Sequence, residues 1–538
     1  MSLQKIIDNK VVSLFILLSF HFLFRIILLS IDAFPFNSDE AIVGLMAKHI
    51  IDGESFLYFY GQSYMGSLDA YLVALGFLIF GEEIWVIRFV QIFIYGLTII
   101  FIYLYVDLAF RNKKIAFISS VFLIFPTINV VLYTTVSLGG YGEAILLGVL
   151  SFYLVELFLK DAKKERKINY KILGLLGLIS GFGLYINPIS LTMIIPACIY
   201  LVFIIVRLTN YKIILKKILP VFLGCFIIGS FLFYYSLFVS NGYSVLNEIG
   251  GSAVAVEKVP FITRSVNHLI SFILFGPSVI MGLRPPWGVE WINIYLIPII
   301  IIFWVFVSYL ILLSIKKQNE YSPIIISLLG IMAFVISGFI FTSFGIDPSG
   351  RYFLPFFFPM SVFAGFIVIS YEKKLLIIIV GLVLFYQLYG VFHAAFKVPY
   401  ITTQFYSIAQ VNHKKIDELK TFLLNEEEYY GFSNYWVSYP LAFISDERIL
   451  AIPKLPYHND LRYTERDNRI SKYNDMIKNG DNYFYITTNN NELDNLLIQS
   501  FKVKSVTYSY KEIDDYHIFY NLSKKITPEE LGFDKEFN

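Results

Sequence analysis

The chain has 538 residues, of which 57% are apolar and only 16% are charged, and its formal net charge is +2. A soluble protein usually carries about 25% charged residues, so this composition excludes an ordinary soluble enzyme. The small net charge, without a concentrated basic patch, excludes nucleic acid as a partner. Residues 393–538 hold 38 of the 84 charged side chains. The sequence therefore predicts a large membrane part followed by a soluble domain.

Long apolar runs dominate the first 392 residues. A helix needs about 20 mostly apolar residues to cross a bilayer, and we expect a mainly α, polytopic membrane bundle of about 11 spans. The first run lacks a small-residue cleavage site, which indicates a retained span rather than a signal peptide. The predicted spans are 11–31, 84–106, 115–132, 143–160, 171–187, 188–207, 218–240, 291–315, 321–343, 352–371 and 374–392.

Basic clusters predict the orientation of these spans. They occur at 111–114, 160–167, 316–317 and 373–374, in alternate loops of the eleven-span arrangement. Positive loops of membrane proteins face the cytoplasm. We therefore expect a multi-pass protein of the plasma membrane with a cytoplasmic N-terminus and an extracytoplasmic C-terminal domain.

Three shorter apolar runs would upset this alternation if they crossed the membrane. We expect them to lie as helices along the outer interface, the last of them broken by Gly276-Pro277. The three runs are 41–51, 67–80 and 268–283.

The composition predicts two domains. Residues 1–394 form the transmembrane domain, in which 32–83 is the first outer loop, and 395–538 form a small α/β domain. In the second domain, "ERILAIP", "NYFYITT" and "YHIFYNL" are typical of strands. Helices are expected at 416–424, 468–479 and 491–500.

Two adjacent carboxylates, Asp39 and Glu40, follow the first span. One interpretation is structural, because Asn37 or Ser38 can cap a helix whose first turn favours acids. The other is functional, because a carboxylate at the membrane surface can deprotonate a hydroxyl acceptor or bind a metal ion. The residues alone leave both interpretations open.

The wider pattern of this loop resembles a known superfamily. A span, the Asp39-Glu40 pair, "GLMAKHIIDGE", "FYGQSYMGSLDAYL" and then "LIFGEEIWVIRFVQ" are similar to the membrane glycosyltransferases of the GT-C superfamily. The closest branch contains the protein O-mannosyltransferases and the aminoarabinose transferases of lipid A. The resemblance implies transfer of a sugar from a polyprenyl-phosphate donor to a glycan, lipid or protein acceptor on the outer face.

The resemblance also implies roles for individual residues. The loop acid of that branch is the catalytic base or an essential site acid, and the matching position is Asp39, with Glu40 assisting it or holding a divalent cation. Gln62 stands where some relatives carry an acid. Mg²⁺ or Mn²⁺ is the candidate cofactor.

Arginines near the outer ends of spans are candidates for the donor phosphate. Arg351, followed by Tyr352 in "RYFLPFFFP", resembles the late-span arginine of these transferases, and Arg284 in "GLRPPWGVEW" is the second candidate. A guanidinium binds phosphate in a bidentate manner. The alternative for both arginines is anchoring at lipid headgroups.

Four further residues complete the candidate site. Glu143 and Asp69 are candidates for the sugar pocket, although each also suits the first turn of a helix. Arg88 is expected to pair with Asp39 or Asp69 and so to support the site. His268 is a candidate metal ligand or an ordinary interface residue.

A flippase or exporter of lipid-linked sugars is the main alternative function, and a structural membrane protein is the second. A transporter lines a path across the midplane with polar groups. Here Ile, Leu and Phe dominate the span interiors, which favours an enzyme acting at one face.

Overall fold

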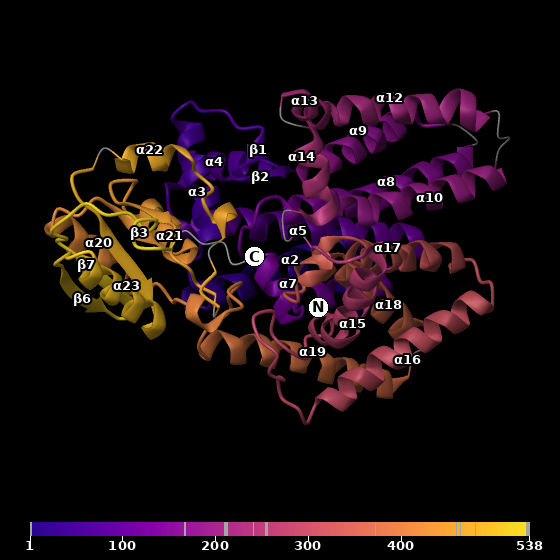
Figure 1. Ribbon diagram of the computed structural model, residues 1–538. Coiled ribbons are helices and arrows are strands. Elements are labelled where there is room, and N and C mark those ends of the chain that lie inside the picture. The colour runs from indigo at the N-terminus through magenta and orange to yellow at the C-terminus, as the bar shows by residue number, and fades with distance from the viewer. Residues whose placement is uncertain are drawn as a thin grey trace. The chain divides into compact units, whose positions relative to one another are not determined.

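The computed structural model describes residues 3–165, 168–208, 213–239, 242–252, 257–371, 373–458, 460–462, 464–478 and 480–533 (Figure 1). Arg166 and Lys167, which belong to the predicted basic cluster 160–167, lie outside these residues. The chain divides into two compact units. The bundle unit comprises Met1–Ile31, Gln62–Asp69 and Arg88–His393, and the tail unit comprises Asp32–Gly61, Ala70–Ile87 and Ala394–Asn538. The tail unit therefore contains most of the predicted first loop as well as the C-terminal domain.

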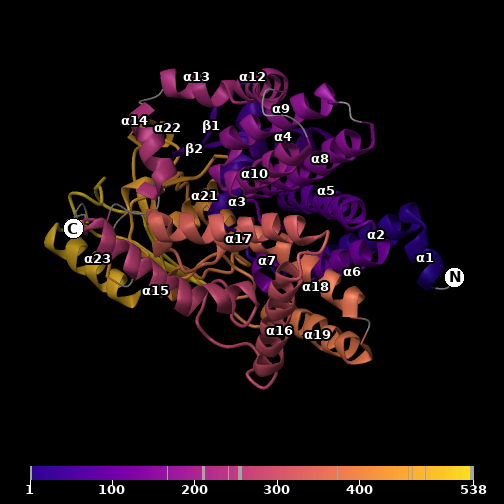
Figure 2. The same ribbon diagram turned by 90° about the vertical axis from the view of Figure 1, so that its right-hand side faces the viewer.

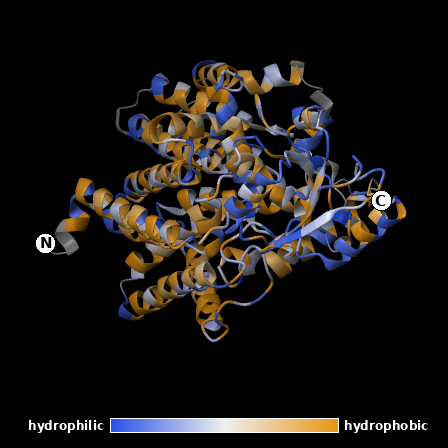
Figure 3. Cartoon of the chain, turned by 90° about the vertical axis from the view of Figure 1, so that its left-hand side faces the viewer, coloured by the Kyte–Doolittle hydropathy of each residue, from blue (hydrophilic) through white to orange (hydrophobic). Residues whose placement is uncertain are grey.

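Membrane-length helices dominate the chain, and Figure 3 shows them mostly in the hydrophobic colour. Within the described residues, eight helical segments are long and apolar enough to span a membrane, or nine if one bent pair counts as a span. This confirms the helical polytopic fold. The eight are α2 (Lys10–Ser30), α5 (Ile84–Phe110), α8 (Tyr141–Glu165), η1 with α10 (Pro188–Ser190, Leu191–Leu208), α16 (Ile297–Lys316), α17 (Ser322–Phe341), η5 with α18 (Arg351–Phe356, Phe357–Tyr371) and α19 (Lys374–Phe396).

Three predicted spans differ from the expected form. The run 115–132 is divided into α6 (Lys113–Ile124) and α7 (Ile128–Tyr133), because Pro126 disfavours helical geometry at the residue before it. The run 171–187 forms α9 (Tyr170–Ile186), whose 17 residues fall just short of the spanning length. The run 218–240 is the bent pair, which turns by 53° around Ser230.

The third predicted interfacial helix also differs from its prediction. Helix α15 begins at Phe261, runs without interruption to Ile280 and contains Pro277, so the predicted break is wrong. Pro277 lies in the last turn of the helix. The remaining short helical segments of the bundle unit are α1 (Leu3–Asp8), η2 (Ile214–Ile218), α12 (Leu219–Gly229), α13 (Phe231–Val239), α14 (Gly242–Asn247), η3 (Glu248–Ser252) and η4 (Ser343–Ile346).

Small residues let two helices of the bundle unit approach closely. Figures 1 and 2 both show α9 alongside α12. A Cβ added at Gly229 would lie 2.1 Å from the carbonyl oxygen of Leu178, and one at Gly181 would lie 2.2 Å from that of Phe226. Glycine is the only residue that permits such backbone contact between membrane helices.

The tail unit contains a mixed five-stranded sheet of order β4-β3-β5-β7-β6. Strand β3 pairs in parallel with β4 and β5, while β7 pairs antiparallel with β5 and β6. The register places Phe432 opposite Ile452 and Tyr485, and Ile518 opposite Ile486. The strands are β3 (Tyr430–Ser433), β4 (Leu450–Pro453), β5 (Phe484–Thr488), β6 (Ser509–Ile513) and β7 (Tyr516–Tyr520).

Helices cover this sheet and complete the core of the tail unit. Leu419 and Leu423 of α20 and Val437 of α21 pack with Phe484 and Ile518 of the sheet. All three predicted strands and all three predicted helices are present, whereas β3, β6 and α21 were not predicted. The helical segments are α3 (Ser38–Ile51), α4 (Leu68–Phe80), η6 (Ser407–Ala409), α20 (Ile416–Asn425), α21 (Tyr435–Ile444), η7 (Glu465–Asp467), α22 (Lys472–Lys478) and α23 (Asn491–Val503); strands β1 (Tyr58–Phe59) and β2 (Gln62–Gly66) lie in the first loop.

Candidate active site

Asp39 lies in the first turn of α3, in the tail unit. The side chain of Asn37 caps this helix by accepting a hydrogen bond from the backbone N–H of Glu40 at 3.1 Å. Asp39 Oδ1 accepts a hydrogen bond from the phenol of Tyr435 at 2.6 Å. Tyr435 is the first residue of α21, and Asn434 caps that helix through the N–H of Trp436. Two helix starts, 396 residues apart in sequence, therefore meet at Asp39.

A half-buried arginine, Arg469, and a second carboxylate, Asp467, lie beside this pair. The guanidinium carbon of Arg469 is 5.8 Å from the centre of the Tyr435 ring, and Arg469 Nη1 donates to the carbonyl of Gly61 at 3.1 Å. Burial raises the pKa of Asp467 to about 7, although the charge of Arg469 opposes this shift. Burial alone would lower the pKa of Arg469, but Tyr435, Asp467 and Asp39 together raise it. The surroundings of Asp39 are therefore aromatic and carry mixed charge.

Glu40 occupies a different environment from its neighbour. Its side chain is fully buried, and Oε2 accepts a hydrogen bond of 3.4 Å from the side chain of Asn37. This contact reinforces the cap of α3, as the structural interpretation of the Asp39-Glu40 pair predicted. The two acids thus differ, because Asp39 is partly exposed while Glu40 is enclosed.

The candidate metal ligand His268 contacts protein oxygens. Its Nδ1 lies 3.1 Å from the carbonyl of Ile340 and its Nε2 lies 3.2 Å from the carboxylate of Glu257. Among the described residues, no group of three or more His, Cys, Asp or Glu side chains is arranged to hold a metal ion. The binding of a divalent cation by Glu40 or His268 stays a prediction.

Asp69 is buried in the bundle unit, where donors surround it. Its Oδ1 accepts from Gln91 Nε2 at 2.8 Å, and its Oδ2 accepts from the Ser137 hydroxyl and from the N–H of Gly139 at 3.3 Å. Gln91 Nε2 also lies 3.3 Å from Glu143 Oε1. Burial raises the pKa of Asp69, while the hydrogen bonds from Ser137 and Gln91 oppose that shift.

This arrangement ties together three parts of the bundle unit. Asp69 is 1% exposed and Glu143 is 3% exposed. Because protein donors occupy both oxygens of Asp69, its carboxylate joins the start of α4 to α5 and to the segment before α8. The predicted role of Asp69 and Glu143 in a sugar pocket stays a prediction.

Arg351 lies at the start of η5, after a glycine turn that positions it. Gly350 has a φ of 87°, which favours glycine, and its carbonyl accepts a hydrogen bond of 3.2 Å from Asn129 Nδ2. The Nη2 of Arg351 lies 2.7 Å from Asp347 Oδ2. Its Nε is buried and has no hydrogen-bond partner among the residues that the structure describes. A buried donor in this condition is costly unless a ligand or water satisfies it.

Aromatic rings extend from Arg351 across the bundle unit. The guanidinium carbon lies 5.1 Å from the centre of the Tyr352 ring, which is 4.7 Å from that of Phe344. Phe344 in turn lies 6.3 Å from Tyr64 of β2. The structure thus places Arg351 and Tyr352 together, as predicted, in an aromatic cluster that also includes a residue of the first loop.

Arg284 has no donor left for a ligand. Its Nε donates to Ser278, and its two Nη atoms donate to four backbone carbonyls at 2.6 to 3.2 Å. The side chain is 2% exposed. These five hydrogen bonds argue against the predicted phosphate contact and indicate that Arg284 holds together the loop after α15. The four carbonyls belong to Phe275, Pro285, Gly288 and Pro348.

Arg88 and the unpredicted residues complete this description. Arg88 is 8% exposed in α5, and its pairing with Asp39 or Asp69 stays a prediction. Tyr435 and Arg469 of the tail unit were not predicted, because no local motif marks a residue whose partner lies about 400 positions away. Gln91 is part of the quoted "LIFGEEIWVIRFVQ" segment; a glutamine amid apolar residues of a span was the available signal for it.

Comparison with known proteins gives a family match and similar folds. Residues 67–233 match the model of the family described as dolichyl-phosphate-mannose-protein mannosyltransferase. The structure of ArnT from Cupriavidus metallidurans bound to undecaprenyl phosphate has a TM-score of 0.54 at 11% identity, covering 94% of this chain and 98% of ArnT. A second similar structure is the archaeal oligosaccharyltransferase AglB from Archaeoglobus fulgidus in complex with an inhibitory peptide and a dolichol-phosphate. It has a TM-score of 0.47 at 11% identity, covering 94% of this chain and 75% of AglB. No curated protein matches the chain.

The family match and the ArnT-like fold confirm the predicted resemblance. The family model matches only residues 67–233, so the comparisons show a segment similar to this mannosyltransferase family and a whole-chain fold similar to that of ArnT. This favours an enzyme over the alternatives of a flippase, an exporter or a structural membrane protein.

Proposed function

We propose that this enzyme transfers a sugar from a polyprenyl-phosphate donor to an acceptor on the extracytoplasmic face of the plasma membrane. The observation that carries the proposal is the state of Arg351, a partly exposed guanidinium with one buried donor that has no partner among the described residues. A phosphate oxygen accepts such a donor in a short, charge-assisted hydrogen bond. The name of the matched family and the lipid bound to ArnT support the choice of donor.

Arg351 and its neighbours are suited to the donor's head. Asp347 fixes one Nη of the guanidinium and leaves the Nε–H free for a phosphate oxygen. The Tyr352 and Phe344 rings offer apolar faces beside it, on which a sugar ring or the first prenyl unit can pack. When the donor's bond breaks, negative charge grows on the phosphate, and a fixed cation stabilises it.

Asp39 is the proposed base. Its carboxylate takes the proton from the acceptor's hydroxyl or amine while that oxygen or nitrogen attacks the anomeric carbon of the sugar. The bond between this carbon and the phosphate oxygen breaks, and its electron pair stays on the phosphate. The products are the glycosylated acceptor and the polyprenyl phosphate. A single displacement inverts the configuration of the anomeric carbon.

The acceptor is a glycan, lipid or protein, and the orientation follows from the basic loops 111–114, 316–317 and 373–374. In this proposed orientation, the first loop, which carries Asp39, and the start of η5, which carries Arg351, belong to extracytoplasmic segments. Membrane lipids surround the spanning helices.

Transfer assays in proteoliposomes test this function. The purified protein is mixed with radiolabelled polyprenyl-phosphate mannose, glucose or galactose and with an envelope fraction as the source of acceptors. We expect one labelled sugar to enter the envelope fraction while unlabelled polyprenyl phosphate accumulates. Movement of intact labelled lipid between leaflets, without cleavage of the sugar–phosphate bond, would contradict the proposal and favour the flippase.

A further inference from the structure

The contact between Asp39 and the tail domain has features beyond those of an ordinary surface hydrogen bond. Tyr435 meets the start of α3 twice: its phenol donates to Asp39 Oδ1 at 2.6 Å, and its carbonyl accepts from the Ser38 hydroxyl. Tyr435 is 4% exposed, and Ser38 is fully buried. The backbone of Tyr435 is thus fixed independently of its phenol, so the phenol has a defined position relative to Asp39.

The phenol of Tyr435 is itself held in place from the other side. Its ring lies 5.0 Å from the ring of Trp436 and 5.5 Å from that of Tyr439, and Arg469 lies against its face. The Tyr439 hydroxyl accepts from the N–H of Arg469 at 2.5 Å and donates to the carbonyl of Asp467 at 2.8 Å. The segment that carries Arg469 and Asp467 is therefore attached to the same helix, α21, as Tyr435.

We propose that the C-terminal domain is part of the catalytic centre, and that Tyr435 is the positioning residue that orients Asp39. This inference rests on the proposed function, in which Asp39 is the base. The phenol occupies Oδ1 and so presents Oδ2 to the acceptor's proton.

Three groups of the tail unit act on Asp39 from outside its own helix. Tyr435 donates a hydrogen bond to it, and the charged groups of Arg469 and Asp467 interact electrostatically with it. On its own helix, Glu40 is the nearest acid. Loss of the Tyr435 hydroxyl removes the hydrogen bond and leaves the other groups in place.

The Tyr435→Phe variant tests this role, because it removes one oxygen and keeps the ring. We expect kcat to fall about tenfold at neutral pH, with a pH–rate profile that differs from that of the wild type. The thermal midpoint should change little, because the Ser38 contact uses the backbone of Tyr435. Activity is followed as transfer, or as release of labelled sugar to water, with the donor that wild-type protein uses.

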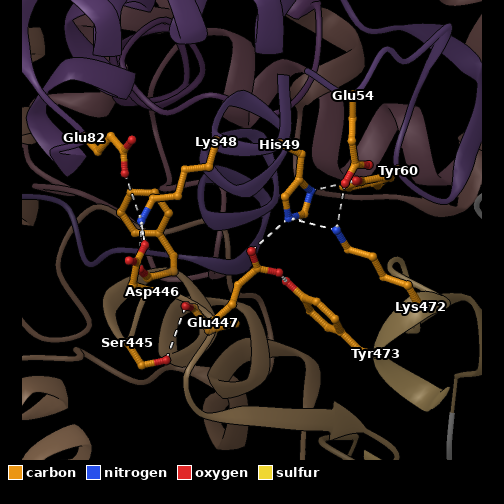
Figure 4. A network of polar contacts seen from close by, with 12 residues as sticks. Lys48, His49, Glu54, Tyr60, Glu82, Ser445, Asp446, Glu447, Lys472 and Tyr473 are labelled. Atoms are coloured by element: carbon orange, nitrogen blue, oxygen red, sulfur yellow. Dashed lines mark hydrogen bonds and ion pairs between the residues drawn. The ribbon is translucent and has the colours of Figure 1, made fainter. Parts of the chain in front are cut away.

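Tyr473→Phe is the matched control. Tyr473 donates to Glu447 Oε1 at 2.6 Å, the same length as the Tyr435–Asp39 bond. Figure 4 shows Tyr473 and His49 at Glu447, whose carboxylate lies 2.9 Å from His49 Nε2, and Lys472 beside His49. His49 belongs to α3, but it is ten residues, or about 15 Å of helix, beyond Asp39. This control removes an equivalent hydrogen bond from the same unit, and we expect its pH–rate profile to match that of the wild type.

The Asp39→Asn variant separates the two proposals. Loss of transfer in Asp39→Asn with an unchanged profile in Tyr435→Phe would overturn the positioning role and keep Asp39 as base. Full activity in Asp39→Asn would overturn the base assignment itself. An equal shift of the profile in Tyr435→Phe and Tyr473→Phe would also contradict the proposal, because the effect would then come from general weakening of the tail unit.

Discussion

Two carboxylates of the first loop illustrate how differently one loop can use the same side chain. Asp69 is enclosed, and its two oxygens accept from Gln91, Ser137 and Gly139. Asp39 is partly exposed, and the hydrogen bond to its side chain comes from one phenol. A saturated carboxylate holds structure together, whereas one with a free oxygen can still accept a proton. We therefore expect Asp69 to contribute to stability, whereas Asp39 is the proposed base.

The two candidate arginines of the bundle unit differ in the same way. Arg284 makes five hydrogen bonds to the protein, while Arg351 retains a buried Nε–H without a partner among the described residues. Both arginines lie near spans and beside prolines and aromatics in sequence. The number of N–H groups that already donate to the protein distinguishes the two arginines, and it is the reason Arg351 is the proposed phosphate contact.

The largest effect is expected for Asp39→Asn. Loss of a general base lowers rates by about 10²- to 10⁴-fold, and we expect a fall in kcat of this size while the fold is retained. Asp417→Asn is the matched control, because Asp417 is an exposed acid in the first turn of α20. Initial rates of sugar transfer are measured for both variants. A wild-type rate in Asp39→Asn would contradict the assignment of Asp39 as the base.

The next effect is expected for Arg351→Lys. Lysine keeps the charge but lacks the fork that binds two phosphate oxygens, so we expect kcat/KM for the donor to fall about 100-fold. In Arg284→Lys, the KM for the sugar donor should be unchanged in the protein that remains folded. Steady-state kinetics over a range of sugar-donor concentrations distinguish the two variants. Similar losses of kcat/KM in both would show that the number of hydrogen bonds each arginine already makes to the protein does not predict its role.

Substitution of Asp69, whose two carboxylate oxygens both accept hydrogen bonds, should lower stability rather than the catalytic rate. In Asp69→Asn, the new amide N–H₂ faces the donors Ser137 and Gly139, which costs about 1–3 kcal/mol per unsatisfied buried group. We expect a lower thermal midpoint in detergent and near-normal kcat in the protein that remains folded. A drop in kcat at unchanged thermal midpoint would instead place Asp69 in the sugar pocket.

Asp467 gives the smallest effect, which depends on pH. Burial raises its pKa to about 7, above the unfolded value of about 4. The folded state therefore binds this proton more tightly, and the stability of the wild type falls as pH rises from about 4 to 7. Asp467→Asn removes this dependence. Thermal midpoints measured across this pH range should fall less in the variant; identical slopes would contradict the raised pKa.

Sequence reasoning predicted the features that depend on local pattern. Apolar length predicted most of the spans, and the cap at Asn37 places α3 as expected. The run 115–132 was misjudged because its apolar content outweighed Pro126, whose backbone restriction divides it into α6 and α7. For a similar reason, Pro277 was given too much weight in α15, where it lies in the last turn.

The site depends on contacts that no local pattern encodes. Asp39 was identified through the resemblance of its loop, but its partner Tyr435 lies 396 residues away, on a helix that was not predicted. In sequence, Arg351 was the first candidate for the phosphate contact and Arg284 the second. Only the positions of the carbonyls around Arg284 reveal that its donors are all engaged.

The most direct test of the central comparison is a paired measurement on Asp39→Asn and Asp69→Asn. For each variant, the rate of sugar transfer per folded molecule and the thermal midpoint are measured in the same preparation. We predict that Asp39→Asn loses transfer at a wild-type thermal midpoint, and that Asp69→Asn loses thermal stability at a near-normal rate. The opposite assignment, with Asp69→Asn inactive but stable and Asp39→Asn active, would contradict the account.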